Sequence, residues 1–513
     1  MSAIERIDGA IGRRPLHGVA ATRALEAAAL ASVAPYALMA RAGGAVARLA
    51  LALVPHSRHI VVFAGPGNNG GDGLEAATRL IGFGKRAEVV LVGSTDRTGD
   101  AATALARARA AGVEIRSFDS ADKQGDGVPD LVIDALLGIG ASRAPEGPIA
   151  AAIERIASVA ARGARVLAID LPSGLDADRG QPYGSHCVVA AETLTMLTLK
   201  PGLFTAAGRD HAGHAWLARL DVGEDSNESP PDAWLVGRAD PSCTAPARRH
   251  AQHKGSFGDV TIVGGAAGMA GAAWLAARAA HAAGAGRVFI DVLGDDGALS
   301  SAALDPLRPE LMFRTGWWRG AAEAVAEATV VCGCGGGDAV RAVLPRLLSI
   351  APRLVVDADA LNAIASDTAL AALTTARAAR GFATVLTPHP LEAARLLGSR
   401  THEVQGDRLR AARELAERYR AVVVVKGSGT VVAAPVEAPR VNATGSAALA
   451  SAGTGDVLAG WIGGRWASAP GAAPVDIATR AVIEHGAAAE PEGAGAIRAG
   501  DLIEALYRRS RSA

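Results

Sequence analysis

The residues Gly453-Thr454-Gly455-Asp456 combine a glycine turn, a hydroxyl group and a carboxylate immediately before the apolar run Val457-Leu458-Ala459. A helix that begins at such a turn presents unpaired backbone N–H groups and the positive end of its dipole, which favours an anion such as phosphate. The carboxylate of Asp456 is either a cap of this helix or the base that activates a hydroxyl group for attack on phosphorus. Neighbouring motifs decide between these two interpretations.

Two more segments of the C-terminal half carry groups suited to a nucleotide. Lys426 precedes Gly427-Ser428-Gly429-Thr430, so an ammonium and a hydroxyl group are placed to reach a phosphate, although the residue order is not that of a P-loop. His389 lies between two prolines and is rigidly held, which is compatible with a ligand contact and with an exposed loop position. Together these groups favour the catalytic interpretation of Asp456.

The N-terminal half has its own glycine-rich turn, Gly65 to Gly73, with the sequence GPGNNGGDG directly after an apolar run. Its glycines allow positive φ angles and close backbone approach, while Asn68, Asn69 and Asp72 place polar side chains at a helix start. The pattern is neither a dinucleotide fingerprint nor a P-loop. A tight strand-to-helix turn without a ligand is the alternative.

Polar side chains also follow two other predicted strands. Asp134 comes after Leu131-Val132-Ile133, and Asp170 comes after Val166-Leu167-Ala168-Ile169. In a parallel sheet the carboxyl ends of the strands meet at one crevice, so these loops and the glycine-rich turn should converge there. Asn69, Asp134 and Ser173 offer hard oxygen ligands, which suit an alkali or alkaline-earth ion rather than zinc.

Apolar, β-branched runs alternating with helical stretches predict an α/β fold with mostly parallel sheets in both halves. Helices between the first strands should begin near Gly71, Gly99 and Gly147. In the first half the expected strands are His59–Ala64, Ala87–Val92, Asp130–Ile133, Arg165–Ile169, Thr193–Leu199 and His214–Leu220. In the second half they are Asp259–Val263, Arg287–Val292, Thr329–Val331, Leu354–Val356, Thr384–Leu386 and Ala421–Val425.

The polar, proline-ended stretch Gly223 to Pro231 separates the two series and reads as a surface linker. The sequence therefore predicts two domains, residues 1–225 and residues 234–513. The chain of 513 residues is long enough for both.

Lysine plus arginine equals aspartate plus glutamate at 52 each, so the charge balance indicates neither nucleic acid nor a membrane surface as a partner. The four cysteines lack the spacing of a zinc or redox centre, which predicts free thiols and a cytoplasmic location. The apolar stretch Ala27 to Ala40 is too short to span a bilayer and is expected to form a buried amphipathic helix.

The segments GPGNNGGDG, DALLGIG, AIDLPSGLDAD and TLTMLTLKPGL resemble the epimerase domain of the bifunctional enzymes that repair hydrated nicotinamide cofactors, NAD(P)HX. The resemblance covers most of residues 15–222. It implies a Rossmann-like domain that interconverts the R and S epimers at C6 of NADHX and NADPHX, with Asp170 as acid/base. The implied substrate-binding residues are Asn68, Asn69, Gly70, Gly71, Asp72, Gly138, Ile139, Gly140, Ala141, Ser142, Arg143, Ala144 and Asp170, and the implied K⁺ ligands are Asn69, Asp134 and Ser173.

The segments HKGSFGDV, DADALN, TPHP, KGSGT and GTGD resemble the ribokinase-like NAD(P)HX dehydratase domain of the same enzymes, over roughly residues 234–510. The resemblance implies that ADP, used with Mg²⁺, phosphorylates the C6 hydroxyl of the S epimer, and that loss of phosphate regenerates NAD(P)H. Asp456 would activate the hydroxyl. The implied nucleotide-binding residues are Lys426, Gly427, Ser428, Gly429, Thr430 and Gly455, and the residues implied to face the hydrated nicotinamide are Ala273, Gly335, His389 and Asp456.

Four departures from the family pattern stand out. The run Cys332 to Gly337 replaces a GPGLG-like turn, Leu391 replaces a glycine, Asn442 to Ser446 replaces an NPTGN-like turn, and Glu75 stands where an apolar residue is usual. The glycine-rich turn is expected to survive, Leu391 to loosen or narrow the pocket, and Glu75 to alter a helix surface. A homo-oligomer is expected. The alternatives to a repair enzyme are a small-molecule kinase of the ribokinase type and a non-catalytic N-terminal scaffold domain.

Overall fold

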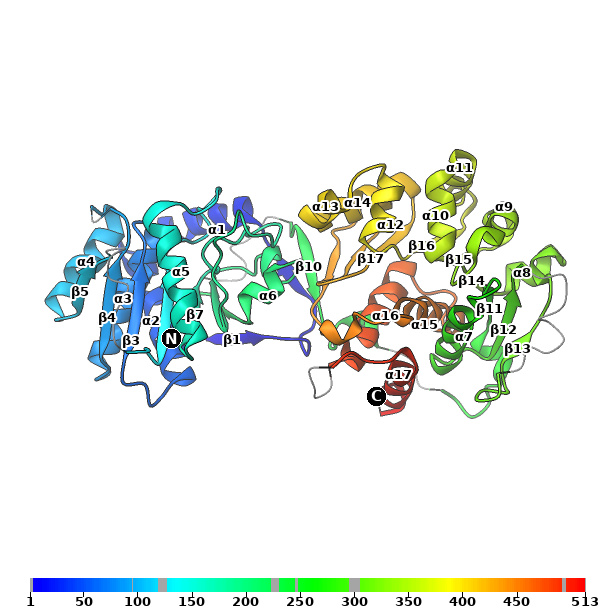
Figure 1. The fold of residues 1–513 in the computed structure, drawn as a ribbon, viewed down its shortest axis with the longest axis horizontal. Helices are drawn as coiled ribbons and strands as arrows, with labels where there is room; N and C mark the ends of the chain where they lie inside the picture. Colours follow the sequence, from blue (N-terminus) through cyan, green and yellow to red (C-terminus); the bar gives the residue numbers. More distant parts are fainter. Residues whose placement is uncertain are drawn as a thin grey trace. The chain divides into compact units, whose positions relative to one another are not determined.

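The computed structural model describes residues 3–94, 96–118, 127–222, 230–244, 248–294, 305–490 and 495–512. The chain divides into two compact units, the first made of Met1–Asp8 and Pro15–Ala233 and the second of Gly9–Arg14 and Trp234–Ala513. Most of the expected linker, residues 223–229, lies outside the described residues. Figure 1 shows the elements of both units along the chain.

The first unit is built on an eight-stranded sheet in the order β1-β9-β8-β7-β6-β3-β4-β5. Every neighbouring pair is parallel except β1 with β9. All six strands predicted for this half are present. The strands are β1 (Ile4–Ile7), β3 (Ile60–Ala64), β4 (Ala87–Leu91), β5 (Glu114–Ser117), β6 (Leu131–Ala135), β7 (Arg165–Ile169), β8 (Glu192–Met196) and β9 (His214–Ala218).

Helices cover both faces of this sheet. Along β3, Val62 packs into the core formed with α2, α3 and α4, whereas Val61 and Phe63 face the core formed with α5. This alternation follows from the period of two in a strand. The helices are α1 (Val19–Ser32), α2 (Ala37–Leu53), α3 (Asn68–Gly82), α4 (Gly99–Ala110), α5 (Gly147–Ala161) and α6 (Gly208–Ala212).

The single helix expected at Ala27 to Ala40 is wrong. Helix α1 ends at Ser32 and α2 begins at Ala37, because Pro35 lies between them and Tyr36 has a φ of 67°. Among the described residues no single helix is long and apolar enough to cross a membrane. The pair α1 and α2 passes that test by length and composition when taken together, but the two are bent by 114°.

Glu75 does not alter a helix surface, contrary to expectation. Its side chain is fully buried and accepts hydrogen bonds from the Tyr36 hydroxyl at 2.6 Å, Arg79 Nε at 2.7 Å and Arg107 Nε at 3.2 Å. Two guanidinium groups compensate the buried carboxylate, so an internal polar cluster joins α3 to its neighbours.

The second unit contains an eleven-stranded sheet in the order β13-β12-β11-β14-β15-β16-β17-β18-β19-β10-β2. The strands from β13 to β17 are parallel, and β18 is antiparallel to both of its neighbours. All six strands predicted for this half are present. The strands are β2 (Arg14–Leu16), β10 (Ala233–Val236), β11 (Asp259–Gly264), β12 (Arg287–Val292), β13 (Met312–Phe313), β14 (Thr329–Cys332), β15 (Arg353–Val356), β16 (Ala383–Leu386), β17 (Val422–Val425), β18 (Val431–Ala433) and β19 (Arg440–Asn442).

The core on one face of this sheet is formed with α7, α15, α16 and α17. In Figure 1 the helices α9 to α14 lie along the other side of the strands. The helices are α7 (Ala270–Ala282), α8 (Ala322–Glu327), α9 (Val340–Ile350), α10 (Ala358–Ser366), α11 (Thr368–Ala376), α12 (Pro390–Leu397), α13 (Thr401–Gly406), α14 (Arg408–Tyr419), α15 (Thr454–Ser468), α16 (Pro474–Ala488) and α17 (Ala499–Ser512).

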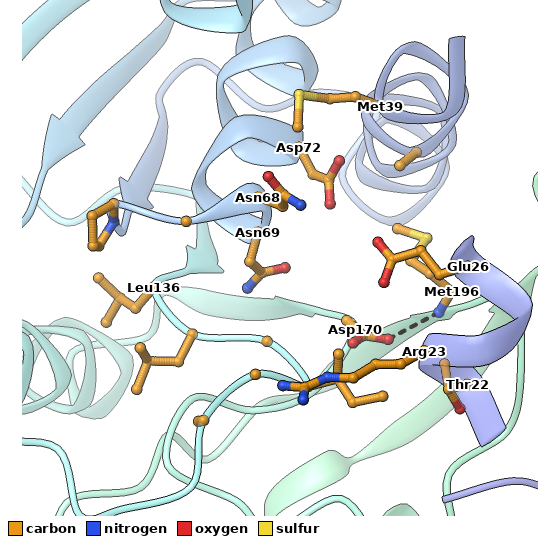
Figure 2. Close-up of a pocket in the computed structure, with 18 of the residues that line it drawn as sticks. Thr22, Arg23, Glu26, Met39, Asn68, Asn69, Asp72, Leu136, Asp170 and Met196 are labelled. Carbon is orange, nitrogen blue, oxygen red and sulfur yellow. Dashed lines mark hydrogen bonds between the residues drawn. The ribbon is translucent and has the colours of Figure 1, made fainter. Parts of the chain in front are cut away.

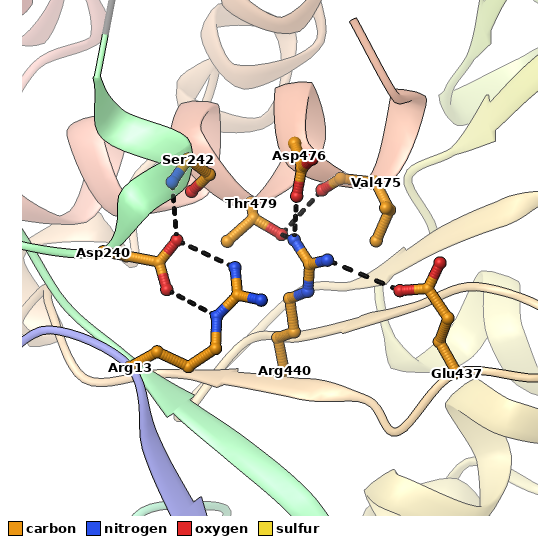
Figure 3. A network of polar contacts seen from close by, with 8 residues as sticks. All are labelled: Arg13, Asp240, Ser242, Glu437, Arg440, Val475, Asp476 and Thr479. Atoms are coloured by element: carbon orange, nitrogen blue, oxygen red, sulfur yellow. Dashed lines mark hydrogen bonds and ion pairs between the residues drawn. The ribbon is translucent and has the colours of Figure 1, made fainter.

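The segment Gly9–Arg14 belongs to the second unit, which differs from the predicted assignment of residues 1–225 to one domain. Arg238 N–H donates to the Gly9 carbonyl at 2.8 Å, and Arg13 forms a bidentate pair with the buried carboxylate of Asp240 at 2.9 and 3.1 Å. Figure 3 shows this pair beside Arg440, which is buried. These bonds account for the placement of an N-terminal segment with the C-terminal fold.

Candidate active sites

A cavity of about 1100 Å³ opens at the carboxyl ends of the central strands in the first unit. Polar groups from three strand ends line it, as expected for a parallel sheet. It brings together most of the residues proposed for substrate binding there. Those that line it are Asn68, Asn69, Asp72, Gly138, Ile139, Gly140, Ala141, Ser142, Arg143, Ala144 and Asp170.

Gly70 and Gly71, also predicted to bind substrate, are buried and do not line the cavity. A Cβ on Gly70 would lie 1.9 Å from the Gly65 carbonyl oxygen, and one on Gly71 would lie 2.6 Å from the Met39 methyl group. Both glycines therefore allow the start of α3 to pack closely against the turn and α2. Their absence of side chains is what positions Asn68, Asn69 and Asp72.

Asp170 has a left-handed backbone with a φ of 65°, which directs its side chain from the end of β7 into the cavity. Its Oδ1 accepts hydrogen bonds from Lys200 Nζ at 2.5 Å and from Met196 N–H at 3.2 Å. Lys200 is fully buried and also donates to Thr195 Oγ1 at 2.9 Å and to the Met196 carbonyl at 2.7 Å. The carboxylate of Asp170 is thus paired with a buried ammonium group at the end of the sheet.

Two further carboxyl groups point into the same part of the cavity, Glu26 from α1 and Asp72 from α3, as Figure 2 shows. Burial raises the pKa of Asp72 well above its usual value, and the nearby charges of Asp170 and Glu26 add to this. Burial also raises the pKa of Glu26, where Lys200 and Arg23 oppose the effect. The cavity thus holds one carboxylate paired with a buried ammonium group and two carboxyl groups with raised pKa values, of which that of Asp72 is raised well above its usual value.

The residues proposed as K⁺ ligands lie beside this cavity. Ser173 donates to Asp134 through Oγ at 2.6 Å and through its backbone N–H at 2.8 Å, while Asn69 lies near the 138–144 loop. Burial raises the pKa of Asp134 to about 6, and the hydrogen bonds from Ser173 and Leu136 oppose this shift. Asn69 Nδ2 is buried without a hydrogen-bond partner among the described residues.

In the second unit Asp456 lies in the first turn of α15, as predicted. The helix begins after Gly453, whose φ is 85°, and no side chain caps its N-terminus. Asp456 is therefore not the helix cap, which removes the alternative interpretation. Burial raises its pKa to about 6; the charge of Asp357 adds to this shift, and a hydrogen bond from the Cys334 thiol and the charge of Lys426 oppose it.

Close packing against α7 and a contact with α16 fix the position of α15. A Cβ on Gly460 would lie 2.0 Å from the Ala276 carbonyl oxygen, and one on Gly464 would lie 2.3 Å from the Ala280 carbonyl oxygen, so the helix rests directly on the backbone of α7. His485 on α16 is within 2.9 Å of the Thr454 carbonyl through Nε2, and burial lowers its pKa to about 4. A neutral histidine thus supports the first residue of the helix.

Lys426 follows β17 and forms an ion pair with the buried Asp357, with 2.7 Å between Nζ and Oδ1. Thr387 Oγ1 donates to the same carboxylate oxygen at 2.8 Å. A Cβ on Gly455 would lie 3.4 Å from Lys426 Nζ, so the ammonium group lies against the start of α15. One cation therefore links the loop after β17 to the helix that carries Asp456.

The loop Gly427 to Thr430 depends on a buried arginine that the sequence analysis missed. Arg408 on α14 donates to the carbonyl oxygens of Val425 at 3.0 Å and of Lys426 at 3.1 Å. Gly427 has a φ of 129° and Gly429 a φ of 59°, and the Thr430 hydroxyl donates to the Gly427 carbonyl at 3.0 Å. The loop is a compact turn with exposed residues Gly427 and Ser428 at its tip.

His389 is the N-cap of α12, where its Nδ1 accepts from the backbone N–H groups of Leu391 at 3.1 Å and Glu392 at 3.4 Å. Its other ring nitrogen, Nε2, is 3.3 Å from Glu392 Oε1, and the side chain is 46% exposed. Burial and the charge of Lys426 lower its pKa. The histidine is thus held by α12 and near Lys426, and the side chain of Leu391 is exposed.

The glycine turn from Cys332 to Gly337 survives the loss of proline. Gly333, Gly335 and Gly337 all have positive φ angles. A Cβ on Gly335 would lie 2.5 Å from the Met269 carbonyl oxygen, so its backbone passes close to the start of α7. Ala273, also on α7 and proposed to face the substrate, is fully buried in the core.

Asn442 and Thr444 replace the expected proline-containing turn with side-chain hydrogen bonds. Thr444 donates to Asn442 Oδ1 through its hydroxyl at 2.9 Å and its N–H at 3.1 Å, and also donates from its hydroxyl to the Ile483 carbonyl at 3.0 Å. Both residues are buried. This departure therefore leaves an ordered turn before α15.

Several residues of the sites carried no assigned role from the sequence. Lys200 and Asp357 stood inside quoted motifs, and a charged residue at the end of a predicted strand was the available signal. Glu26 lies on a helix far from the glycine turns, and Arg408 is one of many arginines on its helix, so nothing local marked them. The residues concerned are Glu26, Lys200, Cys334, Asp357 and Arg408.

Each unit places carboxylates and cations at the carboxyl ends of parallel strands, which defines a two-site α/β enzyme. Two family models match the chain: YjeF-related protein N-terminus over residues 35–202 and NAD(P)H-hydrate dehydratase over residues 260–506. The bifunctional NAD(P)H-hydrate repair enzyme Nnr of Escherichia coli strain K12 is 35% identical over 94% of this chain and 91% of its own. The enzyme of the same name from Moorella thermoacetica is 37% identical over 88% of this chain and 87% of its own.

The chain therefore belongs to the family of bifunctional NAD(P)H-hydrate repair enzymes. The predicted function, an epimerase and a dehydratase acting on hydrated nicotinamide cofactors, is confirmed at this level. The chain is also similar to a solved ADP/ATP-dependent NAD(P)H-hydrate dehydratase from Bacillus subtilis, co-crystallised with ATP/Mg²⁺. That structure is 30% identical, covers 53% of this chain and 95% of its own, and has a TM-score of 0.44.

Proposed function

We propose that the cavity of the first unit interconverts the R and S epimers of NADHX and NADPHX, and that the site around Asp456 dehydrates the S epimer. The observation that carries the proposal is that each reactive carboxylate lies beside the ammonium group of a lysine. Asp170 is paired with Lys200, and Asp456 lies beside the Lys426–Asp357 ion pair at an uncapped helix N-terminus. Both arrangements suit proton transfer and charge stabilisation within a protected site.

In the first unit Asp170 is the acid/base group for inversion at C6. Its ion pair with Lys200 fixes the position of the carboxylate, and its strained backbone holds that carboxylate toward the cavity, where it can accept a proton. The loop Gly138 to Ala144 closes one wall, where Tyr183 holds it through a hydrogen bond to the Ala141 carbonyl at 3.0 Å. The start of α3 offers Asn68, Asn69 and Asp72 to the substrate.

The proposed K⁺ site is consistent with these residues. The buried carboxylate of Asp134 is hydrogen-bonded by neutral donors, and Asn69 and Ser173 contribute an amide and a hydroxyl oxygen, so the residues are of the type that binds a hard cation. When bound, K⁺ would compensate the buried charge and order the glycine-rich turn. Asn69, Asp134 and Ser173 would hold it.

In the second unit Asp456 removes the proton from the C6 hydroxyl of the S epimer as that oxygen attacks the terminal phosphorus of ADP. AMP leaves, and the C6–O bond then breaks with phosphate as leaving group while C5 loses a proton, which restores the double bond of NAD(P)H. Phosphate leaves far more readily than hydroxide. Lys426 and the N–H groups that begin α15 stabilise the phosphoryl charge.

We assign the loop Lys426 to Thr430 together with Gly455 to the nucleotide, and His389 and the turn at Gly335 to the side of the nicotinamide. Ala273 is buried in the core, so it supports that turn from α7 and is not assigned a substrate contact. Carboxylate oxygens of Asp357 and Asp456 lie within 4.8 Å of each other and of Cys334 Sγ. The two oxygens suit Mg²⁺, whereas a thiol does not. When bound, Mg²⁺ would neutralise the phosphates, and these two carboxylates would hold it.

The test is one assay of the purified full-length protein with separated NADHX epimers, Mg²⁺, K⁺ and either ADP or ATP. Both epimers should be converted to NADH, seen as recovered absorbance, and without nucleotide the epimers should only interconvert. A stable phosphorylated product without NADH would instead indicate a small-molecule kinase. Failure to consume either epimer with both nucleotides would refute the proposal.

The role of Asp456 has its own test. Asp456→Ala should leave nucleotide binding nearly unchanged while slowing dehydration by on the order of a hundredfold or more, the usual scale for a catalytic base. Epimerisation by the same protein is the control for folding. Unchanged dehydration would return Asp456 to a structural role.

A further inference from the structure

The epimerase cavity holds two carboxyl groups in opposite environments, Asp170 and Asp72. Both line the same cavity, and Figure 2 shows their side chains approaching its interior from different elements, the end of β7 and the N-terminal part of α3. Asp170 accepts hydrogen bonds from Lys200 and from Met196 N–H. Among the described residues no group donates a hydrogen bond to the carboxyl of Asp72.

Charged residues from several elements line the cavity that Asp72 enters. Glu26 and Arg23 belong to α1, Asp170 follows β7, Lys200 follows β8, and Asp100 lies at the start of α4, while α2 presents the apolar residues Met39 and Ala42. The ammonium group of Lys200 donates hydrogen bonds to Asp170, Thr195 and Met196. Burial and the two carboxylates therefore keep the pKa of Asp72 high.

Inversion at C6 without a net change requires an acid and a base. The C6 carbon bears the hydroxyl group and is bonded to the ring nitrogen. Once it is protonated, the hydroxyl group can leave as water, because the nitrogen lone pair forms a C=N bond to C6. Water must then add to the other face of the ring and lose a proton. Two carboxyl groups in different environments, one held by a cation and one without a hydrogen-bond donor among the described residues, supply this pairing of roles.

We propose that Asp72 is a second catalytic residue of the epimerase, the general acid that works with Asp170 as general base. The inference rests on the proposed epimerase function of this cavity. Asp72 gives its proton to the C6 hydroxyl group. The C6–O bond then breaks, its two electrons leave with the water molecule, and the nitrogen lone pair forms a C=N bond to C6. A water on the other face attacks C6, the C=N electrons return to nitrogen, and Asp170 takes the proton.

The resting state is restored when Asp170 releases its proton to solvent and Asp72 regains one, so one water leaves and one enters with no oxidant or reductant. In the reverse direction the same two groups exchange roles after proton exchange. Glu26 acts on Asp72 through its charge. It faces Lys200 and Arg23, which favour its ionised form, whereas the charges that act on Asp72 are both negative.

The test uses the full-length protein without nucleotide, so that dehydration is silent, and follows R to S conversion of NADHX chromatographically. Asp72→Asn should lower kcat by about a hundredfold with little change in KM, because a proton donor is lost while the shape of the cavity is kept. The wild-type rate should fall at high pH as Asp72 ionises, and this alkaline limb should be absent in Asp72→Asn. Dehydration of the S epimer with ADP, measured on the same sample, shows that the chain is folded.

Two companion measurements keep the proposal falsifiable. Glu26→Gln removes one of the negative charges near Asp72, so the alkaline limb of the epimerisation rate of this variant should move to lower pH. Asp72→Glu keeps a carboxyl group, so it should retain an alkaline limb at a reduced rate. In H₂¹⁸O, epimerisation should place ¹⁸O at C6, because the C6–O bond breaks in each turnover. A full kcat and an intact alkaline limb in Asp72→Asn, or inversion without ¹⁸O, would overturn the proposal. A wild-type protein that does not interconvert the epimers would instead refute the epimerase function itself.

Discussion

Nζ of Lys426 lies 2.7 Å from Oδ1 of Asp357, and this ion pair stands beside the carboxylate of Asp456. Asp357 contributes a negative charge that raises the pKa of Asp456, and Lys426 contributes a positive charge that lowers it. Burial is the largest cause of the raised pKa of the proposed dehydratase base, and this pair of residues from two different strand ends, β15 and β17, adjusts it further.

The first prediction concerns Asp357→Asn. Asp456 must be ionised to act as a base, so dehydration should fall as the pH drops through its pKa of about 6. Removing the charge of Asp357 lowers that pKa, so the acid limb of kcat/KM for the S epimer should move to lower pH. The measurement is a pH profile at saturating ADP. An acid limb that stays in place would show that Asp456 does not carry it.

Cys334→Ala tests the same carboxylate in the opposite direction. The hydrogen bond from the thiol favours the ionised form of Asp456, so its loss should raise the pKa and move the acid limb to higher pH. Because Cys334 is fully buried and alanine is smaller, the variant also needs a thermal unfolding control. The two variants should thus displace one limb in opposite directions, which a general loss of structure would not do.

Lys200→Met should disable epimerisation while leaving dehydration unchanged. The substitution keeps an unbranched side chain but removes the only ammonium group that bonds Asp170 among the described residues, and a buried carboxylate without its cation favours protonation. Asp170 then lacks the cation that holds it, so kcat of epimerisation should fall by about tenfold or more. Epimer interconversion without nucleotide measures this. A KM effect alone would reduce Lys200 to a structural role.

The sequence was sufficient for the elements that follow simple periodicity. Buried parallel strands such as β3 and β17 are continuous apolar runs, which made them predictable. Asp134 near the end of β6 and Asp170 directly after β7 were predicted as site residues because of their places at strand ends. The edge strand β5 was not predicted because it is polar and exposed, and β18 and β19 because each has three residues. Cytoplasmic location and homo-oligomerisation stay predictions.

The partners of the reactive carboxylates could not be predicted for a different physical reason. Glu26, Lys200 and Arg408 act through contacts between residues far apart in the chain, and each stands in a segment whose local pattern is an ordinary helix or strand end. Glu75 shows the same limit from the other side: its buried position depends on Tyr36 and Arg107, which only the tertiary structure brings to it. Local periodicity in the sequence predicts the helices and strands, whereas the partners of buried charges depend on the tertiary structure.

The last prediction concerns Arg13, which joins the N-terminal segment to the second unit. Its guanidinium forms a bidentate pair with Asp240, whose side chain is fully buried, while 29% of the Arg13 side chain is exposed. Arg13→Ala would leave the carboxylate without its cation, so the second unit should lose about 2 kcal/mol, less than for a fully buried pair. The exposed pair of Arg498 and Asp501 provides the matched control, because Arg498→Ala should have no measurable effect. Urea unfolding followed by dehydratase activity should show a lower midpoint for Arg13→Ala, while the transition followed by epimerase activity stays unchanged. Equal dehydratase midpoints for Arg13→Ala and Arg498→Ala would show that Arg13 does not stabilise the second unit.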